Sequence, residues 1–415
     1  MKILHTSDWH LGQVLYEYDR TEEQRDFLEQ LVSIAEQEHP DAMVLCGDVF
    51  DKVSPSTEAR QLYVKALLKL HDHCPNMQIV VTAGNHDGKS ALEVEALLWD
   101  RLQVRVVGQV FRHENGEINI ERHIVEVFND ASKRIGYIIA VPHIYENYYP
   151  QTDDSQTKEE RQKAFFQLLL DAVAARNTDN LPVVLTAHLS LAGSNFAGHQ
   201  FADSIGTIEV VDQSQLGTGY DYLALGHIHN AKTFTGSGPV ARYCGTPLPV
   251  AFDEQGKHSV SIVNLMPGTE VSIREVPVHN IRPLLTIPPK PIPFEEALLE
   301  LSQLPDNTEA YIRLNVLQNG PLPPNHIERI LQVLEVKRAR YCTVKTSKPS
   351  QNQLTDAPWA AGMVNADNMP TPRELASYFY DKKYGVPLDD ELLNMLDEAI
   401  KSATNTLQEP ENKML

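Results

Sequence analysis

Two histidines, His227 and His229, stand two positions apart at the end of the apolar segment in YLALGHIHNA (residues 222–231). In an extended chain, residues i and i+2 point to the same side, so both imidazoles can face one pocket. An isolated His-x-His pair is more often a surface feature in a turn, here after Gly226, than a metal site. Other polar groups in the chain must therefore decide between the two interpretations.

Acidic, amide and imidazole side chains follow four further apolar segments, each of which we predict to be a strand. They occur in the sequences SDWH, GDVFD, GNHD and VVLTAH. In open α/β sheets the pocket lies beyond the carboxyl ends of the strands, so five strands are expected to bring their ligands to one place. These candidate residues are Asp8, His10, Asp48, Asn85, His86, His188, His227 and His229.

The candidate donors are imidazole nitrogens and carboxylate or amide oxygens, without a thiolate. This mixture suits Mn²⁺, Fe or Zn²⁺ better than Ca²⁺. Two metal ions ~3.5–4 Å apart need a bridging group, and we expect Asp48, on the central strand, to bridge them. The role of His143 is left open, and the other histidines are expected to be exposed to solvent, namely His71, His73, His113, His123, His199 and His258.

The composition is that of a globular protein, with 42% hydrophobic and 22% charged residues among 415. This length predicts two or three domains. The chain has no long uncharged apolar run, so no membrane span is predicted. Asp8 comes too early in the chain to leave room for a signal peptide before it. We therefore expect a cytoplasmic protein. The 4 cysteines form no Cys-x-x-Cys pair, which excludes a zinc finger and predicts reduced thiols.

The formal net charge of −20 argues against general nucleic-acid binding, which needs a basic surface. A metal site can reverse the local field. Asp8 and Asp48 contribute two negative charges, and two divalent ions would contribute roughly four positive charges. We therefore expect a locally positive pocket in an acidic protein. Much of the affinity for any nucleic acid is expected to come from a partner.

Apolar strands and amphipathic helices alternate in the first two thirds of the chain, which predicts a layered α/β core with a mixed or doubled sheet. One predicted helix has a capping box at Thr21 and Gln24, and another begins after Ser54-Pro55. The predicted strands span 2–6, 42–45, 78–82, 136–141, 183–186, 222–225 and 258–265.

The remaining third divides into shorter parts. Residues 267–293 form a break, because the proline-rich IPPKPIPF cannot continue a central strand. A small α/β domain is predicted next, with two helices (294–301 and 325–334) and two strands (310–316 and 340–346). We thus expect domains at 1–270 and 280–346, a polar linker at 347–370 and a helical hairpin at 371–405. The apolar face of the hairpin is expected to bind a partner rather than to dock back on the body.

The sequences DWHLG, GDVFD, GNHD and GHIH, with the His188 segment, resemble the signature of the calcineurin-like metallophosphoesterases. The finer pattern in ILHTSDWHLGQ, LALGHIH and RYCGTPLPVAFDE (242–254) is similar to the SbcD family, the nuclease subunits of bacterial SbcCD complexes. These motifs cover residues 1 to about 265. The resemblance implies layered mixed β-sheets flanked by helices, a small α/β capping domain and a C-terminal helical hairpin.

The resemblance also implies roles for the candidate residues. One Mn²⁺ would be bound by Asp8, His10, Asp48 and His229. A second would be bound by Asp48, Asn85, His188 and His227, with His86 as the acid beside the scissile phosphate. Relatives often have histidine where this chain has Asp51, so Asp51 either orients a ligand or caps the following helix. Lys89 either contacts the DNA backbone or, more plainly, is exposed to solvent.

The function implied by the resemblance is that of an Mn²⁺-dependent DNA nuclease. Relatives act as 3′→5′ exonucleases on duplex DNA and as endonucleases on single strands and hairpins, in repair and recombination. They work with an SbcC-type ATPase, which would bind the hairpin, and a homodimer within a heterotetramer is expected. The alternatives are a small phosphodiesterase or phosphatase, a non-catalytic DNA-end scaffold, and an interaction module that uses only the hairpin. Protein phosphatases of the superfamily have Arg-Gly after the second motif and Glu at the end of the third, unlike GDVFDKV and GNHD here.

Overall fold

The computed structural model describes residues 1–145, 148–150, 156–194, 210–236, 238–254, 256–318 and 320–348, with isolated positions between 373 and 397. The chain divides into two compact units, Met1–Ser347 and Lys348–Leu415. The predicted linker (347–370) and helical hairpin (371–405) lie outside the described residues except for a few positions, and so does His199. The domain boundaries drawn from the sequence thus remain predictions. None of the described helices is long and apolar enough to cross a membrane.

The first sheet has the strand order β16-β15-β1-β4-β5-β6. The strands β1, β4, β5 and β6 run parallel to one another, β15 is antiparallel to β1, and β16 is antiparallel to β15. The central strands are apolar and almost wholly buried, as expected for parallel strands covered on both faces. The bounds are β1 (Lys2–Thr6), β4 (Ala42–Cys46), β5 (Gln78–Thr82), β6 (Val104–Val107), β15 (Ser259–Asn264) and β16 (Ser272–Pro277).

The second sheet has the order β13-β14-β12-β9-β8-β7. Its inner strands β14, β12, β9 and β8 are parallel, and both edge strands are antiparallel to their neighbours. The bounds are β7 (Ile124–Phe128), β8 (Arg134–Ile139), β9 (Val183–His188), β12 (Tyr222–Gly226), β13 (Lys232–Phe234) and β14 (Val240–Tyr243).

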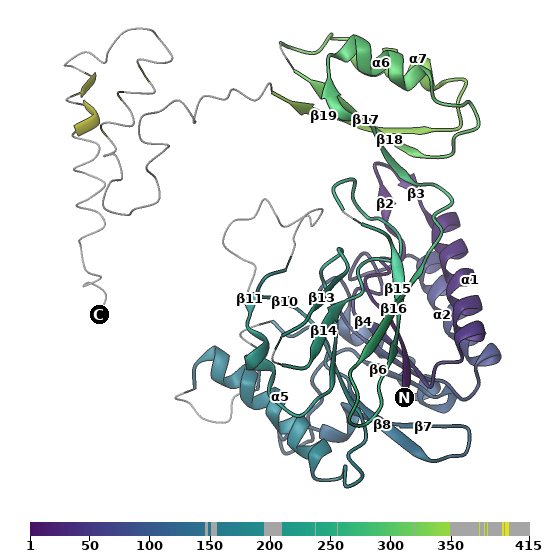
Figure 1. The fold of residues 1–415 in the computed structure, drawn as a ribbon, viewed down its shortest axis with the longest axis vertical. Coiled ribbons are helices and arrows are strands. Elements are labelled where there is room, and N and C mark those ends of the chain that lie inside the picture. Colours follow the sequence, from purple (N-terminus) through teal and green to yellow (C-terminus); the bar gives the residue numbers. More distant parts are fainter. Residues whose placement is uncertain are drawn as a thin grey trace. The chain divides into compact units, whose positions relative to one another are not determined.

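The two sheets pack face to face through one apolar core that contains Val44 and Val80 from the first sheet and Val184 and Ala224 from the second. A second core lies between the first sheet and helices α1 (Thr21–Glu38) and α2 (Thr57–His73). A third lies between the second sheet and α5 (Lys158–Ala174). The result is a helix–sheet–sheet–helix sandwich, which confirms the predicted α/β class (Figure 1).

Short elements complete this part of the chain. They are β2 (Val14–Leu15), β3 (Tyr18–Asp19), α3 (Lys89–Leu92), α4 (Ala96–Trp99), β10 (Ser190–Leu191) and β11 (Val210–Val211), with 3-10 turns at Asp100–Leu102, Ile120–Arg122 and Gln213–Leu216. The α3 and α4 turns follow the GNHD segment directly.

A separate three-stranded parallel sheet follows, in the order β17-β18-β19. Helices α6 and α7 pack on it around a core of their own. The proline-rich segment lies within β17, a strand that the sequence pattern did not predict; β17 is an edge strand, where proline is tolerated. The bounds are β17 (Leu284–Ile292), α6 (Phe294–Ser302), β18 (Tyr311–Leu317), α7 (His326–Leu334) and β19 (Arg340–Ser347).

Two local predictions were wrong, and a third was confirmed. Thr21 is the first residue of α1 and makes no capping box, because the side chain of Gln24 instead donates to the His10 carbonyl and accepts from the backbone N–H of Gly12. The helix predicted after Ser54-Pro55 is confirmed: α2 begins at Thr57, and Ser56 caps it by accepting from the backbone N–H of Ala59. His123 is buried rather than exposed, and burial lowers its pKa to about 4.

Candidate metal centre

The predicted site residues all follow the carboxyl ends of the parallel strands, and the structure brings them together. Strands β1, β4 and β5 of the first sheet lead into the segments with Asp8, Asp48 and Asn85. Strands β9 and β12 of the second sheet lead to His188, which ends β9, and to His227. The site therefore spans the carboxyl edges of both sheets, and its geometry depends on how the two sheets pack.

Asp48 occupies the middle of the site. Its Oδ2 lies 3.3 Å from Nε2 of His188 and 3.8 Å from Nε2 of His10. Its Oδ1 accepts a hydrogen bond of 2.9 Å from the backbone N–H of His86. Burial opposes ionisation of this carboxyl, but His188 and His10 hold its pKa well below the ordinary value. The Asp48 carboxylate thus contacts His10 from the first sheet and His188 from the second sheet.

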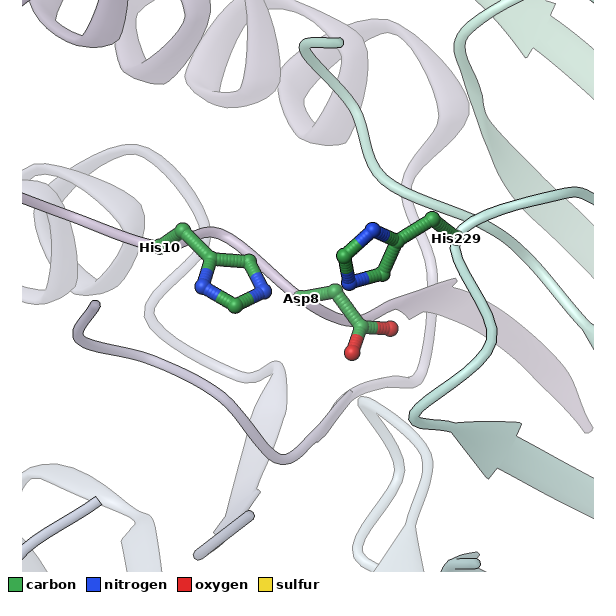
Figure 2. A group of neighbouring side chains, drawn as sticks. All are labelled: Asp8, His10 and His229. Carbon is green, nitrogen blue, oxygen red and sulfur yellow. The ribbon is translucent and has the colours of Figure 1, made fainter. Parts of the chain in front are cut away.

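One group of ligands consists of Asp8, His10 and His229, whose nearest donor atoms all lie within 4.8 Å of one another. Figure 2 shows the two imidazole rings on either side of the Asp8 carboxylate, each with one ring nitrogen toward it. All three side chains are buried. The Asp8 carboxylate also accepts a hydrogen bond of 2.9 Å from the backbone N–H of His227, which joins the first strand to the last of the five.

A second group surrounds the amide oxygen of Asn85. This Oδ1 lies 3.0 Å from Nε2 of His188 and 3.0 Å from Nδ1 of His227. Donor atoms of His188, Asp48 and Asp8 also lie within 4.8 Å of one another. The described residues therefore provide two neighbouring sets of metal donors with Asp48 between them.

Three of the histidines have their other ring nitrogen next to an acceptor. Nδ1 of His188 donates to the Cys46 carbonyl at 2.8 Å, and Nδ1 of His229 donates to the Glu254 carboxylate at 3.1 Å. Nδ1 of His10 lies 3.4 Å from Oδ1 of Asp51. Such acceptors fix the ring orientation and the tautomer of a metal-binding histidine, so Nε2 is the nitrogen that faces the shared carboxylates.

Glu254 was not singled out from the sequence. Its carboxylate is 1% exposed and accepts from the Thr246 hydroxyl at 3.0 Å as well as from His229. The backbone N–H groups of Val250 and Ala251 donate to the same oxygen as His229, each at 3.1 Å. Burial raises the pKa of Glu254 to about 7. The only signal in the sequence was its place at the end of RYCGTPLPVAFDE.

The backbone of the site is strained. Asp8, His10, Asp48 and His227 all have positive φ, at 54°, 45°, 49° and 95°. Non-glycine residues adopt this region at a free-energy cost of ~1–3 kcal/mol each, and such residues cluster at active sites. All four of these strained residues carry side chains with metal-binding chemistry.

Glycine is required at two places in the ligand segments. Gly47 has φ of 81°, and a Cβ on it would lie 2.1 Å from Nδ1 of His188. A Cβ on Gly84 would lie 2.0 Å from Oδ1 of Asp48. Both glycines therefore allow ligands from neighbouring strands to approach the backbone closely.

The site has the electrostatics of a cation-binding pocket. Both ring nitrogens of His10 are buried, and within the described residues Nδ1 has only the 3.4 Å contact with Asp51 and Nε2 only the 3.8 Å contact with Asp48. Burial disfavours the charged imidazolium, yet the carboxylates of Asp51, Asp48 and Asp8 raise the pKa of His10 to about 9. Burial also opposes the charge on His188, but Asp48 raises its pKa to about 9. The pocket stabilises positive charge on these two rings, so it also favours divalent cations that replace the protons. Its nitrogen and oxygen donors are of the types that bind such cations.

The structure also decides several points that the sequence left open. Asp51 faces His10 and does not cap α2, whose cap is Ser56. The ring of His143 lies at the site, where its Nδ1 donates to the His188 carbonyl at 3.0 Å. Lys89 is half-buried rather than freely exposed, with its ammonium 4.9 Å from the centre of the Tyr145 ring.

A buried carboxylate, Asp87, organises the loops around the site. It accepts from the backbone N–H groups of Gly84 at 2.8 Å and of Phe50 at 2.9 Å. Burial and the nearby Asp48 raise its pKa to about 6. Asp87 thereby links the GDVFD segment to the GNHD segment, so that Asp48 and Asn85 are held in register.

The sandwich fold with metal donors at its carboxyl edge defines a metallophosphoesterase, and residues 1–231 match the family model of the calcineurin-like phosphoesterases. The curated SbcD, the nuclease component of SbcCD, from Rhodobacter capsulatus is 33% identical over 75% of this chain and 78% of its own length. The SbcD proteins of Bacillus subtilis (31% identical, 69% of this chain, 71% of the relative) and Escherichia coli K12 (30%, 69% and 70%) are similar. The chain belongs to this SbcD family of nucleases.

Proposed function

We propose that the protein is an Mn²⁺-dependent DNA nuclease with 3′→5′ exonuclease activity on duplexes and endonuclease activity on single strands and hairpins. One ion would be bound by Asp8, His10, Asp48 and His229. The other would be bound by Asp48, Asn85, His188 and His227. Two divalent ions held there would supply Lewis acidity and activation of water for phosphodiester hydrolysis.

One observation carries this proposal: Oδ2 of Asp48 lies between Nε2 of His188 and Nε2 of His10, at 3.3 and 3.8 Å. A carboxylate between two sets of donors is the arrangement that a pair of neighbouring ions needs. The acceptors behind His10, His188 and His229 support it, because they orient ligands before any ion binds.

His86 is proposed as the acid that protonates the departing 3′ oxygen. Its ring centre lies 4.9 Å from that of His10, so it borders the ligands. Its Nδ1 donates to the Asp51 carbonyl at 2.9 Å, which leaves Nε2 as the nitrogen that can give a proton to substrate. Its backbone N–H donates to Oδ1 of Asp48 at 2.9 Å, which ties the His86 segment to the proposed bridging carboxylate.

The proposed partners are DNA ends and hairpins and an SbcC-type ATPase, which would contribute ATP binding. The net charge of −20 supports a complex in which the partner supplies much of the DNA-binding surface. A cytoplasmic location is proposed for such a complex, on the basis of the family resemblance.

A homodimer within this assembly is supported by an exposed aliphatic surface directly after the GNHD segment. Val94, Leu97 and Leu98 are 73%, 81% and 65% exposed. Aliphatic side chains that are this exposed and this close in the sequence are typical of protein–protein interfaces.

A phosphatase or small phosphodiesterase would use the same donors, but the relatives are named as nuclease subunits and match over most of their length. A non-catalytic scaffold would not need strained ligands held by oriented histidines. The test is incubation of labelled duplex, hairpin and single-stranded DNA with the protein and Mn²⁺, with and without the ATPase partner. Products with 5′ phosphate and 3′ hydroxyl ends are expected. Hydrolysis of p-nitrophenyl phosphate esters without DNA cleavage would instead support the phosphatase alternative.

A further inference from the structure

A row of aromatic rings leads from the metal centre to the protein surface. The His143 ring is stacked on that of His227, with centres 6.4 Å apart and planes at 26°. Tyr145 contacts His143 edge-on at 4.6 Å, and Tyr148 contacts Tyr145 at 6.4 Å. Tyr145 therefore lies two ring contacts away from a proposed metal ligand.

The outer two rings are exposed, although tyrosine is a large and partly apolar side chain. Tyr145 is 51% exposed and Tyr148 is 75% exposed. The inner ring, His143, is half-buried and contacts the rings of His188 and His227. The row is thus packed against the proposed ligand His227 at its inner end and open to solvent at the other end.

A positive charge lies beside the exposed rings. The Lys89 ammonium is 4.9 Å from the centre of the Tyr145 ring, a cation–π distance. Among the residues that the structure describes, Lys89 forms no ion pair with a carboxylate. Its ammonium charge is therefore available to an anionic group that approaches the Tyr145 ring.

We propose that Tyr145, Tyr148 and Lys89 form a binding site for an unstacked base and its phosphate on the DNA strand that enters the metal centre. This inference rests on the proposed nuclease function and adds a substrate preference to it. Bases stack on exposed aromatic side chains irrespective of their identity, while a nearby cation contacts the backbone.

The chemistry of the site favours unpaired DNA. Inside a duplex both faces of each base are covered by neighbouring bases, and only the terminal pair of a blunt end has one free face, so a tyrosine ring finds few π-faces to contact. Single strands, hairpin loops and frayed ends offer that face. The site is therefore expected to favour cleavage of these substrates over that of a blunt, fully paired duplex.

A second copy of the chain is the competing occupant of these rings, since the exposed Val94, Leu97 and Leu98 follow Lys89 closely in the sequence. Two features favour DNA. The rings adjoin the proposed catalytic groups without a break, and the charge beside them is positive, which complements phosphate.

The experiment compares initial rates of Mn²⁺-dependent cleavage of a single-stranded oligonucleotide, a hairpin and a blunt duplex. In Tyr145→Ala, the ratio of single-strand to duplex cleavage is expected to fall about tenfold, the order of one lost base–aromatic stack. Tyr145→Phe keeps the ring and is expected to keep the ratio. Tyr148→Ala, which changes a more exposed residue, is expected to lower the ratio in the same direction.

Phe128→Ala provides a matched control, because Phe128 is also exposed (44%) but lies at the end of the edge strand β7. It is expected to keep the wild-type ratio. An unchanged ratio in both Tyr145→Ala and Tyr148→Ala, with wild-type melting temperatures, would overturn the inference. A shift from dimer to monomer in Tyr145→Ala during sedimentation would overturn it too, in favour of the second copy. If the wild type cleaves none of the DNAs, the proposed function fails instead.

Discussion

The Glu254 carboxylate accepts a hydrogen bond of 3.1 Å from Nδ1 of His229, although the two residues lie on different segments of the chain. The bond turns Nε2 of His229 toward Asp8 (Figure 2). The adjacent residue, Asp253, pairs with Arg313 of β18 at 2.9 Å and with Lys345 of β19 at 3.0 Å. The loop that orients a proposed ligand is therefore also tied to the small three-stranded sheet, and a movement of that sheet would act on the loop that holds His229.

Replacement of Glu254 tests whether this carboxylate orients the ligand. Glu254→Gln is expected to lower Mn²⁺ affinity about 10- to 100-fold, the usual range for the partner of a metal-binding histidine. The measurement is titration calorimetry with Mn²⁺. Glu93→Gln is the control, because the half-buried Glu93 likewise accepts backbone N–H bonds, from Gly108 and Gln109, and these residues are not proposed ligands. Equal affinity in wild type and Glu254→Gln would contradict the orienting role.

Replacement of Asp48 tests the shared carboxylate. Asp48→Ala is expected to abolish high-affinity binding of both ions, because each donor set loses its common oxygen ligand and the positive charges lose their central counter-charge. The stoichiometry is measured by calorimetry and by manganese electron paramagnetic resonance. Two ions bound with wild-type affinity in the variant would exclude Asp48 as the bridge.

Replacement of His86 separates metal binding from proton transfer. His86→Ala is expected to retain Mn²⁺ stoichiometry and to lower the cleavage rate by about 10²- to 10⁴-fold, the usual contribution of a general acid. Its backbone N–H, which donates to Asp48, is unchanged by the substitution. A variant that cuts DNA at the wild-type rate would remove His86 from this role.

The pH dependence follows from His10 and His188, whose pKa values of about 9 exceed the ordinary value of 6.5 in the unfolded chain. When protonated, these two histidines stabilise the metal-free fold. Their contribution to the free energy of unfolding is complete below pH 6.5 and is lost as the pH rises through about 9. Burial lowers the pKa of His229 to about 4, so its own effect on stability changes only below pH 6.5. The melting temperature of the EDTA-treated protein is thus expected to fall between pH 6.5 and 9.

Mn²⁺ affinity is expected to change in the opposite direction over the same range, since the ions must displace protons from the His10 and His188 rings. Calorimetry at pH values of about 6.5, 7.5 and 8.5, in buffers of different ionisation enthalpy, measures both the affinity and the protons released. Affinity that is independent of pH, with no proton release, would contradict the interpretation of these two histidines.

Removal of the C-terminal segment tests the proposed partner site. A chain that ends before Thr371 is expected to lose co-purification with the SbcC-type ATPase while it keeps Mn²⁺-dependent cleavage of short DNA. The proposed metal donors all lie in the unit Met1–Ser347, which supports retention of the basal activity. Undiminished binding of the ATPase by the shortened chain would place the contact elsewhere.

Much of the site could be predicted because its signals are local. The central strands are continuous apolar runs, and their predicted bounds agree with the structure to within about two residues. Ligand types follow from the residues at the strand ends, and parallel strands must end at the same edge of a sheet. The three-stranded sheet was harder to predict, because its edge strand β17 tolerates the prolines that a central strand does not.

The sequence by itself determined the order of the elements, the chemical types of the donors and the family to which they point. Only the tertiary structure decided which acceptors hold the histidines: the Cys46 carbonyl for His188, Asp51 for His10 and Glu254 for His229. It also decided that His123 is buried and that Tyr145 and Lys89 lie together beside His143. The physical reason is that strand and helix periodicity depend on neighbours along the chain, whereas these contacts depend on how two sheets and their loops pack.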